Sequence, residues 1–217
     1  MGRGPGARGP SRSLAEEIRA TARPGQADRA VKAFDQAVAL LDKGRDAAAL
    51  AAARQAKDLA PRSGAVREVL GMSLYRTEQF REALRELQAY RRITGRADQN
   101  HLIADSHRAL GDPEKAIEPV REALRSRIAE SARVEAAVVG ASALADLGRY
   151  AEALGMLKAY RPEGRGAREG DLRLWYVTGD VLVRAGRPRE AAEEFRRIIR
   201  YEPGAFDAAE RLAQLGG

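Results

Sequence analysis

From Ala27 onward, apolar residues recur at spacings of three and four, as they do on one face of a helix. No segment bounded by turn residues alternates apolar and polar positions in the way a half-buried strand does. The helical pattern breaks near Gly44, Gly111, Gly148 and Gly186, and each break is followed at once by another periodic segment. Because such short breaks join antiparallel helices, the pattern predicts successive helix pairs and no strand.

One break lacks its glycine. Glycine at the end of a helix adopts the left-handed conformation that other residues adopt only at a cost, and the second break has Glu78 at this place. The sequence therefore indicates the second turn less clearly than the others. Pro61 and Pro203 are expected to end the helices before them, and the segment 162–170 (PEGRGAREG) is expected to be an exposed loop.

Aligning the segments on their turns shows two positions that always hold a small residue. Without a bulky side chain, two helix axes can approach to the low end of the usual range of about 8–10 Å. We interpret both positions as contacts between paired helices. The first set is Ala37, Gly71, Ala104, Ala141 and Gly179, and the second is Ala49, Ala83, Ala116, Ala153 and Ala191.

The pattern resembles the tetratricopeptide repeat (TPR), a helix–turn–helix unit of about 34 residues. The resemblance covers about residues 27–215, and the last repeat matches the signature best, at Trp175, Gly179, Leu182, Ala191, Phe195 and Pro203. It implies an all-α, right-handed α-solenoid of about five TPR-like helix pairs. An apolar stripe of Phe206, Ala209 and Leu212 predicts a C-terminal capping helix over 205–215.

The N-terminal part differs from this repeat domain, which is expected over residues 27–217. Residues 1–26 form a basic tail rich in Gly, Pro and Arg, predicted to be disordered apart from a short helix at about 14–22. Ser13 and Glu16 have the spacing of a capping box. Because isolated helices this short are marginal in water, the helix must dock on a surface, either of its own solenoid or of another chain.

Composition narrows the class of protein. The chain has no cysteine, which excludes disulfides and thiolate sites, and no apolar run long enough to span a membrane. We expect a cytoplasmic protein. The net charge is +7, and all but five of the 38 basic residues are arginine. This bias is typical of phosphate and carboxylate recognition, but a G+C-rich genome also produces it, so nucleic acid remains an alternative partner.

No motif in the chain indicates catalysis. Gly4–Gly9 reads G-x-G-x-x-G but lacks the strand and helix of a dinucleotide site. His101 and Asp105 share a helix face, as a metal pair or an oriented base would, yet no third ligand is evident, and His107 falls at a packed position. We predict a protein that is not an enzyme and has no catalytic residue, cofactor or metal.

The resemblance implies that the first helices line a concave groove. We predict a non-catalytic interaction module that binds a peptide or helix of a partner protein in this groove, with aromatic and methionine side chains as anchors and arginines as carboxylate clamps. The residues implied are Phe34, Glu68, Met72, Tyr75, Arg76, His101, Asp105, Arg108, Arg173, Tyr176, Asp180 and Arg184.

Two alternatives stay open. An RNA- or ribosome-associated factor would explain the positive charge, the Arg-Gly tail and the arginines of the last repeat's second helix, Arg189, Arg196, Arg197 and Arg200. A self-assembling homo-oligomer would use the helix at 14–22 to dock into a neighbouring chain. The identity of the partner and the oligomeric state do not follow from the sequence.

Overall fold

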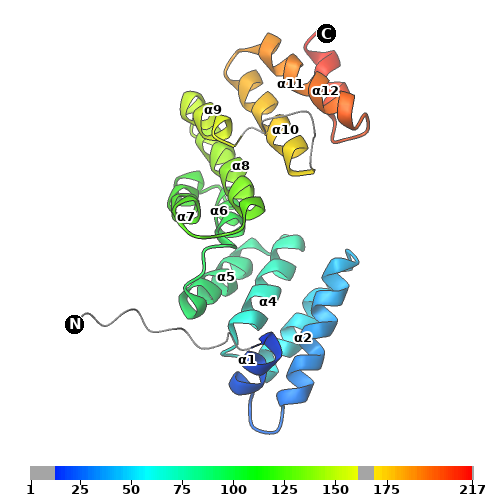
Figure 1. Ribbon diagram of the computed structural model, residues 1–217, viewed down its shortest axis with the longest axis vertical. Coiled ribbons are helices and arrows are strands. Elements are labelled where there is room, and N and C mark those ends of the chain that lie inside the picture. Colours follow the sequence, from blue (N-terminus) through cyan, green and yellow to red (C-terminus); the bar gives the residue numbers. More distant parts are fainter. Residues whose placement is uncertain (1–12, 161–168, 217) are drawn as a thin grey trace, which may run out of the picture. The chain divides into compact units, whose positions relative to one another are not determined.

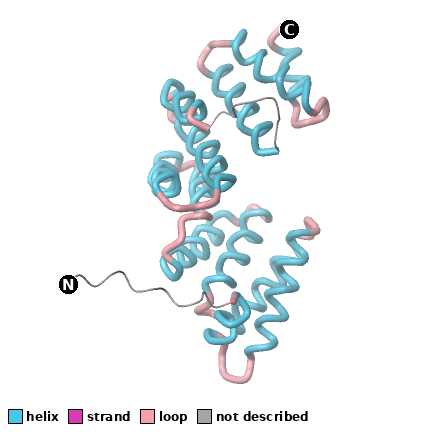
Figure 2. Tube along the Cα trace, in the orientation of Figure 1, coloured by secondary structure: helices cyan, strands magenta, loops and turns pink. Residues whose placement is uncertain are grey.

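The computed structural model describes residues 13–160 and 169–216, and this part of the chain contains twelve α-helices and no strand (Figure 1). Loops join the helices directly (Figure 2). The chain divides into two compact units, 1–95 and 96–217. The tail over residues 1–12 with its G-x-G-x-x-G segment, and residues 162–168 of the expected loop, lie outside the described residues.

Unit 1 consists of a short N-terminal helix and two helix pairs. α1 (Leu14–Thr21) precedes the pair of α2 (Ala27–Asp42) and α3 (Asp46–Leu59), and the pair of α4 (Gly64–Arg76) and α5 (Phe80–Thr94) follows. The first helices α2 and α4 contact each other, and α3 contacts α4. The last residues of α3 and α11 come just before Pro61 and Pro203, as expected.

Unit 2 contains three helix pairs and a final short helix. The first helices α6, α8 and α10 lie against one another in that order, and each pairs with the helix that follows it. The five pairs predicted from the sequence are therefore present, two in unit 1 and three in unit 2. The elements of unit 2 are α6 (Asn100–Ala109), α7 (Pro113–Arg125), α8 (Glu130–Asp146), α9 (Tyr150–Lys158), α10 (Glu169–Arg184), α11 (Pro188–Tyr201) and α12 (Ala208–Gln214). The expectation of a single solenoid domain over 27–217 stays a prediction.

The turn inside each helix pair is built around one residue with a positive φ angle. Gly44, Gly111, Gly148 and Gly186 have φ between 67° and 81°. Glu78 occupies the same place in the second pair with φ of 59°. The second turn thus has the same backbone geometry as the others. Glu78 adopts a left-handed conformation there, which is energetically unfavourable for a residue with a side chain.

The two positions that always hold a small residue are close contacts between paired helices. All eight alanines at these positions have no exposed surface. A Cβ atom added to Gly71 would lie 2.6 Å from the Leu87 side chain, and one added to Gly179 would lie 2.8 Å from the Phe195 ring. Leu87 and Phe195 belong to the second helix of the same pair. The interpretation of these positions as helix contacts is therefore confirmed.

The N-terminal helix α1 docks on unit 1 of its own chain. Its start has the predicted capping box between Ser13 and Glu16. The side chain of Ile18 is fully buried, and α1 contacts both α2 and α4. The carboxylate of Glu17 accepts a hydrogen bond from the Ser63 Oγ at 2.6 Å. Self-assembly through this helix loses its support, because the helix is already packed.

The C-terminal helix α12 caps the last repeat with a different residue from the one expected. Ala208 is 1% exposed and contributes to the core of unit 2, whereas Ala209 is exposed. Leu212 packs against the core, as predicted. Phe206 lies before the helix and is 54% exposed. In the apolar stripe, Ala208 is thus buried in place of the predicted Ala209, and Phe206 lies outside the helix.

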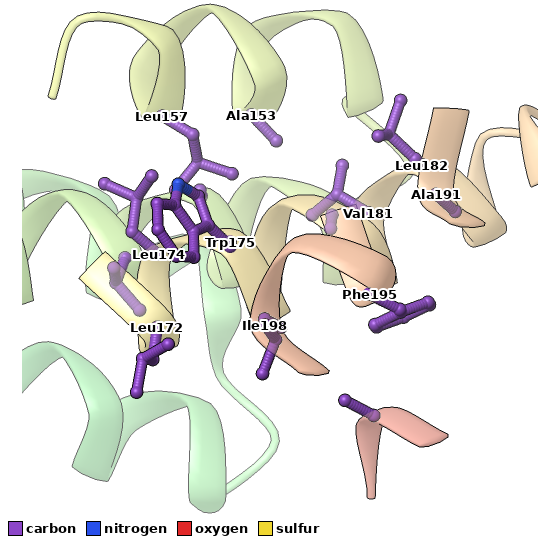
Figure 3. Packing of buried hydrophobic residues seen from close by; sticks show 14 of the residues in the cluster. Ala153, Leu157, Leu172, Leu174, Trp175, Val181, Leu182, Ala191, Phe195 and Ile198 are labelled. Atoms are coloured by element: carbon purple, nitrogen blue, oxygen red, sulfur yellow. The ribbon is translucent and has the colours of Figure 1, made fainter. Parts of the chain in front are cut away.

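The core of the last repeats is made by residues of α8 to α12. Figure 3 shows Ala153 and Leu157 of α9 directed toward Trp175 and Val181 of α10. Phe195, from α11, has no exposed surface in the same cluster. The signature residues of the last repeat are thus mostly scaffold, and residues that could contact a partner must lie on the remaining faces of these helices.

Candidate functional site

The candidate residues of unit 1 form a partly exposed stripe on α4. Glu68, Met72, Tyr75 and Arg76 alternate with the buried residues of the helix and follow its 3.6-residue period. Phe34 of α2, which was expected on the same surface, is only 8% exposed and belongs to the core. The aromatic ring at this position therefore packs inside the repeat and is not available as an anchor.

Arg76, at the end of the α4 stripe, is held by the preceding repeat. Its Nη1 donates to the backbone carbonyl oxygen of Leu41 at 2.7 Å and lies 3.3 Å from the Asp46 carboxylate. The Tyr75 ring contacts the Phe80 ring edge-on, with centroids 5.8 Å apart. Met72 is the residue of the stripe that makes no polar or ring contact with the rest of the described chain.

In unit 2 the candidate stripes of neighbouring first helices are joined by ion pairs. Arg108 of α6 binds Asp105 at 2.6 Å and Asp146 of α8 at 2.9 Å. The other carboxylate oxygen of Asp146 binds Arg184 of α10 at 3.0 Å. Arg184 also donates to the carbonyl oxygen of Ala145 at 2.7 Å.

The same network continues to the C-terminal helix. Asp180 of α10 lies 4.0 Å from Arg184 and accepts a hydrogen bond from Arg211 of α12 at 2.7 Å. We name the series Arg108, Asp146, Arg184, Asp180 and Arg211 the charge ladder. Its side chains are between 24% and 34% exposed, so the ladder lies at the surface of unit 2.

Tyr176 is covered by the segment that leads into α12. Its hydroxyl donates to the Asp207 carboxylate at 2.6 Å, and its ring lies 4.8 Å from that of Phe206. Burial and this hydrogen bond raise the pKa of Tyr176 to about 12. Arg173, one turn earlier, pairs with Glu135 of α8 at 2.8 Å. With Asp180 and Arg184 of the charge ladder, all four candidates of α10 thus have partners inside the chain.

His101 is held in a neutral, half-buried state. Its Nδ1 lies 3.0 Å from the carbonyl oxygen of Asp98, which favours the tautomer with the proton on Nδ1. Burial lowers the pKa of His101 below its ordinary value. Asp105 pairs with Arg108. The two residues are therefore not assembled into a metal pair or an oriented base.

The described residues contain no cluster of three or more His, Asp or Glu side chains that could hold a metal ion. Within the same ranges, no helix is both long and apolar enough to cross a bilayer. His107, the other histidine, is half-buried, and burial also lowers its pKa.

The sequence reasoning missed Arg211 of the charge ladder and two carboxylates, Asp207 and Glu135, that bind candidate residues. Asp207 and Arg211 sit beside the apolar residues that identified the capping helix, but their role depends on where that helix docks. Glu135, on α8, was missed because its pairing with Arg173 depends on how α8 and α10 lie against each other. The available signal was Asp146 in one repeat and Arg184 at the same place in the next.

Residues 102–199 match the family model of the tetratricopeptide repeat. No curated protein sequence matches the chain. A thermophilic TPR protein of Thermus thermophilus superposes with a TM-score of 0.68 at 18% identity, over 86% of this chain and 98% of that one. YrrB, a TPR protein with an unusual peptide-binding site, gives 0.58 at 19% identity, over 92% and 97%.

A human IFIT1 dimer with m7Gppp-AAAA gives a TM-score of 0.64 at 17% identity, over 84% of this chain and 45% of that one. At these identities the structures are evidence of a shared fold. Residues 102–199 therefore match the tetratricopeptide repeat family, and the described helix pairs outside this range share the fold of solved TPR structures.

Proposed function

We propose that the chain is a non-catalytic adaptor that holds a peptide or helix of a partner protein against the faces formed by its first helices. These are α2 and α4 in unit 1, and α6, α8 and α10 in unit 2. One observation carries the proposal: the partly exposed residues of these helices form stripes, and in unit 2 the stripes are tied into one surface by the charge ladder. TPR proteins in general serve as interaction scaffolds.

The charge ladder supports binding by fixing its arginines in place. Arg108 donates from Nε to Asp146 and from Nη1 to Asp105, and its Nη2 has no hydrogen bond among the described residues. A guanidinium that is already oriented loses little side-chain entropy when it donates to a carbonyl or carboxylate of a ligand. In unit 1, Met72 and Tyr75 offer adaptable apolar contact area instead. The likeness to YrrB, whose description includes a peptide-binding site, agrees with this function.

Affinity capture with the immobilised full chain tests the proposal. Proteins retained from a lysate are compared between the wild type and a variant with Met72→Glu, Tyr75→Ala and Arg108→Gln. The matched control is Arg85→Gln, on the exposed side of the second helix α5. We expect partners that the control retains and the triple variant loses. An identical set of partners on a triple variant that is still folded by circular dichroism would disprove it.

The exposed arginines of α11 favour a second candidate function, the binding of RNA. Arg189, Arg196 and Arg200 are exposed along one side of this helix and form no ion pair within the described ranges. Arg197 lies 5.3 Å from the centroid of the Trp175 ring and pairs with Glu194. Binding through phosphates predicts an affinity that falls steeply with salt. Filter binding at two salt concentrations checks this, and no retained RNA at either would remove the candidate.

A further inference from the structure

Unit 2 has two pockets between consecutive second helices. One, of about 470 Å³, lies between α7 and α9 over Leu144 of α8. The other, of about 310 Å³, lies between α9 and α11 over residues of α10, including Leu182. Neither pocket is lined by any of the candidate residues of the first-helix faces. They form a separate surface, which we name the outer pockets.

The outer pockets occupy the same place in successive repeats. Five positions that line both of them stand at equal distances from the turn glycines Gly111, Gly148 and Gly186. They supply an aliphatic residue, a cation, a leucine from the first helix, and an Arg–Glu pair. The equivalent residues are Ile117 and Leu154, Arg121 and Lys158, Leu144 and Leu182, Arg149 and Arg187, and Glu152 and Glu190.

Each outer pocket has one cation, Arg121 or Lys158, that forms no hydrogen bond or ion pair with a described side chain. The charge of Arg121 also helps to lower the pKa of Glu152. Lys158 lines its pocket from α9, whereas Glu193 and Glu194 line the same pocket from α11. Arg149 binds both oxygens of Glu152 at 2.7 Å, which lowers the pKa of that carboxyl group. The equivalent arginine of the next repeat binds Glu190 through two hydrogen bonds of 2.6 Å. Because these glutamates are satisfied by the residue three positions earlier, Arg121 and Lys158 form no hydrogen bond or ion pair in the described part of the chain.

The corresponding groove of unit 1 shows what happens when that arginine is absent. Gln79 takes the place of Arg149, and Glu82 takes the place of Glu152. Arg54, equivalent to Arg121, then bridges from α3 to α5 and donates to both residues at 3.0 Å. Arg54 of unit 1 therefore binds residues of its own chain, whereas the equivalent Arg121 of unit 2 can pair with an anion of a ligand.

The pocket between α9 and α11 also contains an unused donor. Trp175 lines it and is 4% exposed, and its indole Nε1 has no hydrogen-bond partner among the described residues. A buried tryptophan N–H normally finds an acceptor.

We propose that the outer pockets are a second interaction surface, which binds an acidic segment of a partner protein. One apolar side chain enters each pocket, and carboxylates of the segment pair with Arg121 and Lys158. The aliphatic lining, which includes Ile117, Leu124 and Met156, suits apolar side chains better than it suits nucleic-acid phosphates.

The geometry of the repeat limits the segment. The first helices α6, α8 and α10 pack on one another, which places successive repeats, and with them the two pockets, about 10 Å apart. The two apolar anchors are then separated by about three residues of extended chain or about seven residues of helix. The surface does not share residues with the first-helix faces. It can therefore function whether or not those faces bind a partner.

A random peptide library displayed on phage, panned against the immobilised full chain, tests the proposal. We expect selected peptides to combine Asp or Glu with two apolar residues at one of these spacings. Synthetic copies labelled with fluorescein are then titrated with protein variants by fluorescence anisotropy. Arg121→Gln with Lys158→Gln should weaken binding about tenfold. Neither side chain pairs with another described residue, so the double variant should keep the melting temperature of the wild type.

A second variant tests the pairing argument itself. Arg149→Gln with Arg187→Gln recreates the arrangement of unit 1 and frees Glu152 and Glu190 to pair with the cations. Binding should fall by a similar factor although neither proposed ligand cation is removed. Met72→Glu with Tyr75→Ala on the first-helix face of unit 1 should bind like the wild type, which separates this proposal from the proposed function.

Three results would overturn the proposal. One is a library that yields no acidic and apolar consensus. Another is equal peptide affinity for the wild type and both double variants. The third is RNA retention by the full chain that is lost in the Arg121→Gln, Lys158→Gln variant while no peptide is selected, since this would assign the cations to phosphates.

Discussion

The carboxylate of Glu17 accepts a hydrogen bond of 2.7 Å from the backbone N–H of Gly64, 47 residues along the chain. Its second oxygen accepts from Ser63 Oγ, which itself caps α4 by accepting from the Val66 N–H at 3.1 Å. A negative charge at a helix N-terminus is also favoured by the helix dipole. The N-terminal helix is therefore fastened to the start of α4 by one side chain.

Glu17→Ala should destabilise unit 1 by about 1–3 kcal/mol, because it leaves the buried Gly64 N–H and Ser63 hydroxyl without their acceptor. Urea unfolding followed by circular dichroism measures the change. The control is Arg19→Ala, whose ion pair with Asp28 spans 3.4 Å between side chains that are 50% and 92% exposed. We expect the control to change stability by less than about 0.5 kcal/mol. Equal urea midpoints for the two variants would contradict the role of Glu17.

Two glycines in the middle of helices should respond in opposite ways to alanine. Gly179→Ala places a Cβ 2.8 Å from the Phe195 ring and should cost about 1–3 kcal/mol by overpacking. Gly155, in α9, has no atom within 4 Å of the added Cβ. Gly155→Ala should therefore stabilise the protein by about 0.5–1 kcal/mol through helix propensity. Melting temperatures that move in the same direction would show that the helix contact is placed wrongly.

Glu78→Gly should stabilise the second helix pair. The left-handed conformation costs an L-residue about 1–2 kcal/mol, and glycine avoids this cost. Part of the gain is offset because glycine has more conformational freedom in the unfolded chain. We expect a gain of about 1 kcal/mol in urea unfolding. Gly148→Ala, at a φ of 73°, is the reverse control and should lose about 1 kcal/mol. A loss of stability in Glu78→Gly would mean that its side chain has a role that the turn geometry does not explain.

The helix pairs and their contacts were predictable because they depend on spacing within one repeat. Glycine or its substitute at the turn, and a small residue at the two contact positions, hold in every repeat and need no knowledge of the neighbours. The partners of the exposed charges were not predictable in the same way. Arg184 binds Asp146 and the Ala145 carbonyl only because the preceding repeat places them within reach.

The outer pockets were predictable from the sequence only in part. The exchange of Gln79 for arginine in the last two repeats is visible in the aligned sequence. Its consequence for Arg54 and Arg121 appears only when the second helices are placed side by side. A substitution at one repeat position thus changes the partner of a residue in the helix before it. Periodicity alone does not report this.

His101 should make the protein less stable in mild acid. Burial lowers its pKa below the ordinary 6.5, because the charged ring is poorly solvated. The unfolded chain therefore binds this proton more readily than the folded chain does. The stability contributed by the neutral ring is present above pH 6.5 and is lost as the pH falls through the lower pKa of the folded state.

His101→Gln should flatten the decline of stability between about pH 7 and 5 relative to the wild type. His107, whose pKa burial also lowers, is kept in both proteins, so the difference between the two curves isolates His101. Urea unfolding at a series of pH values gives the curves, and the NMR shift of the ring proton gives the pKa in the folded state. Parallel stability curves, or a folded pKa at or above 6.5, would contradict the buried neutral state of this ring.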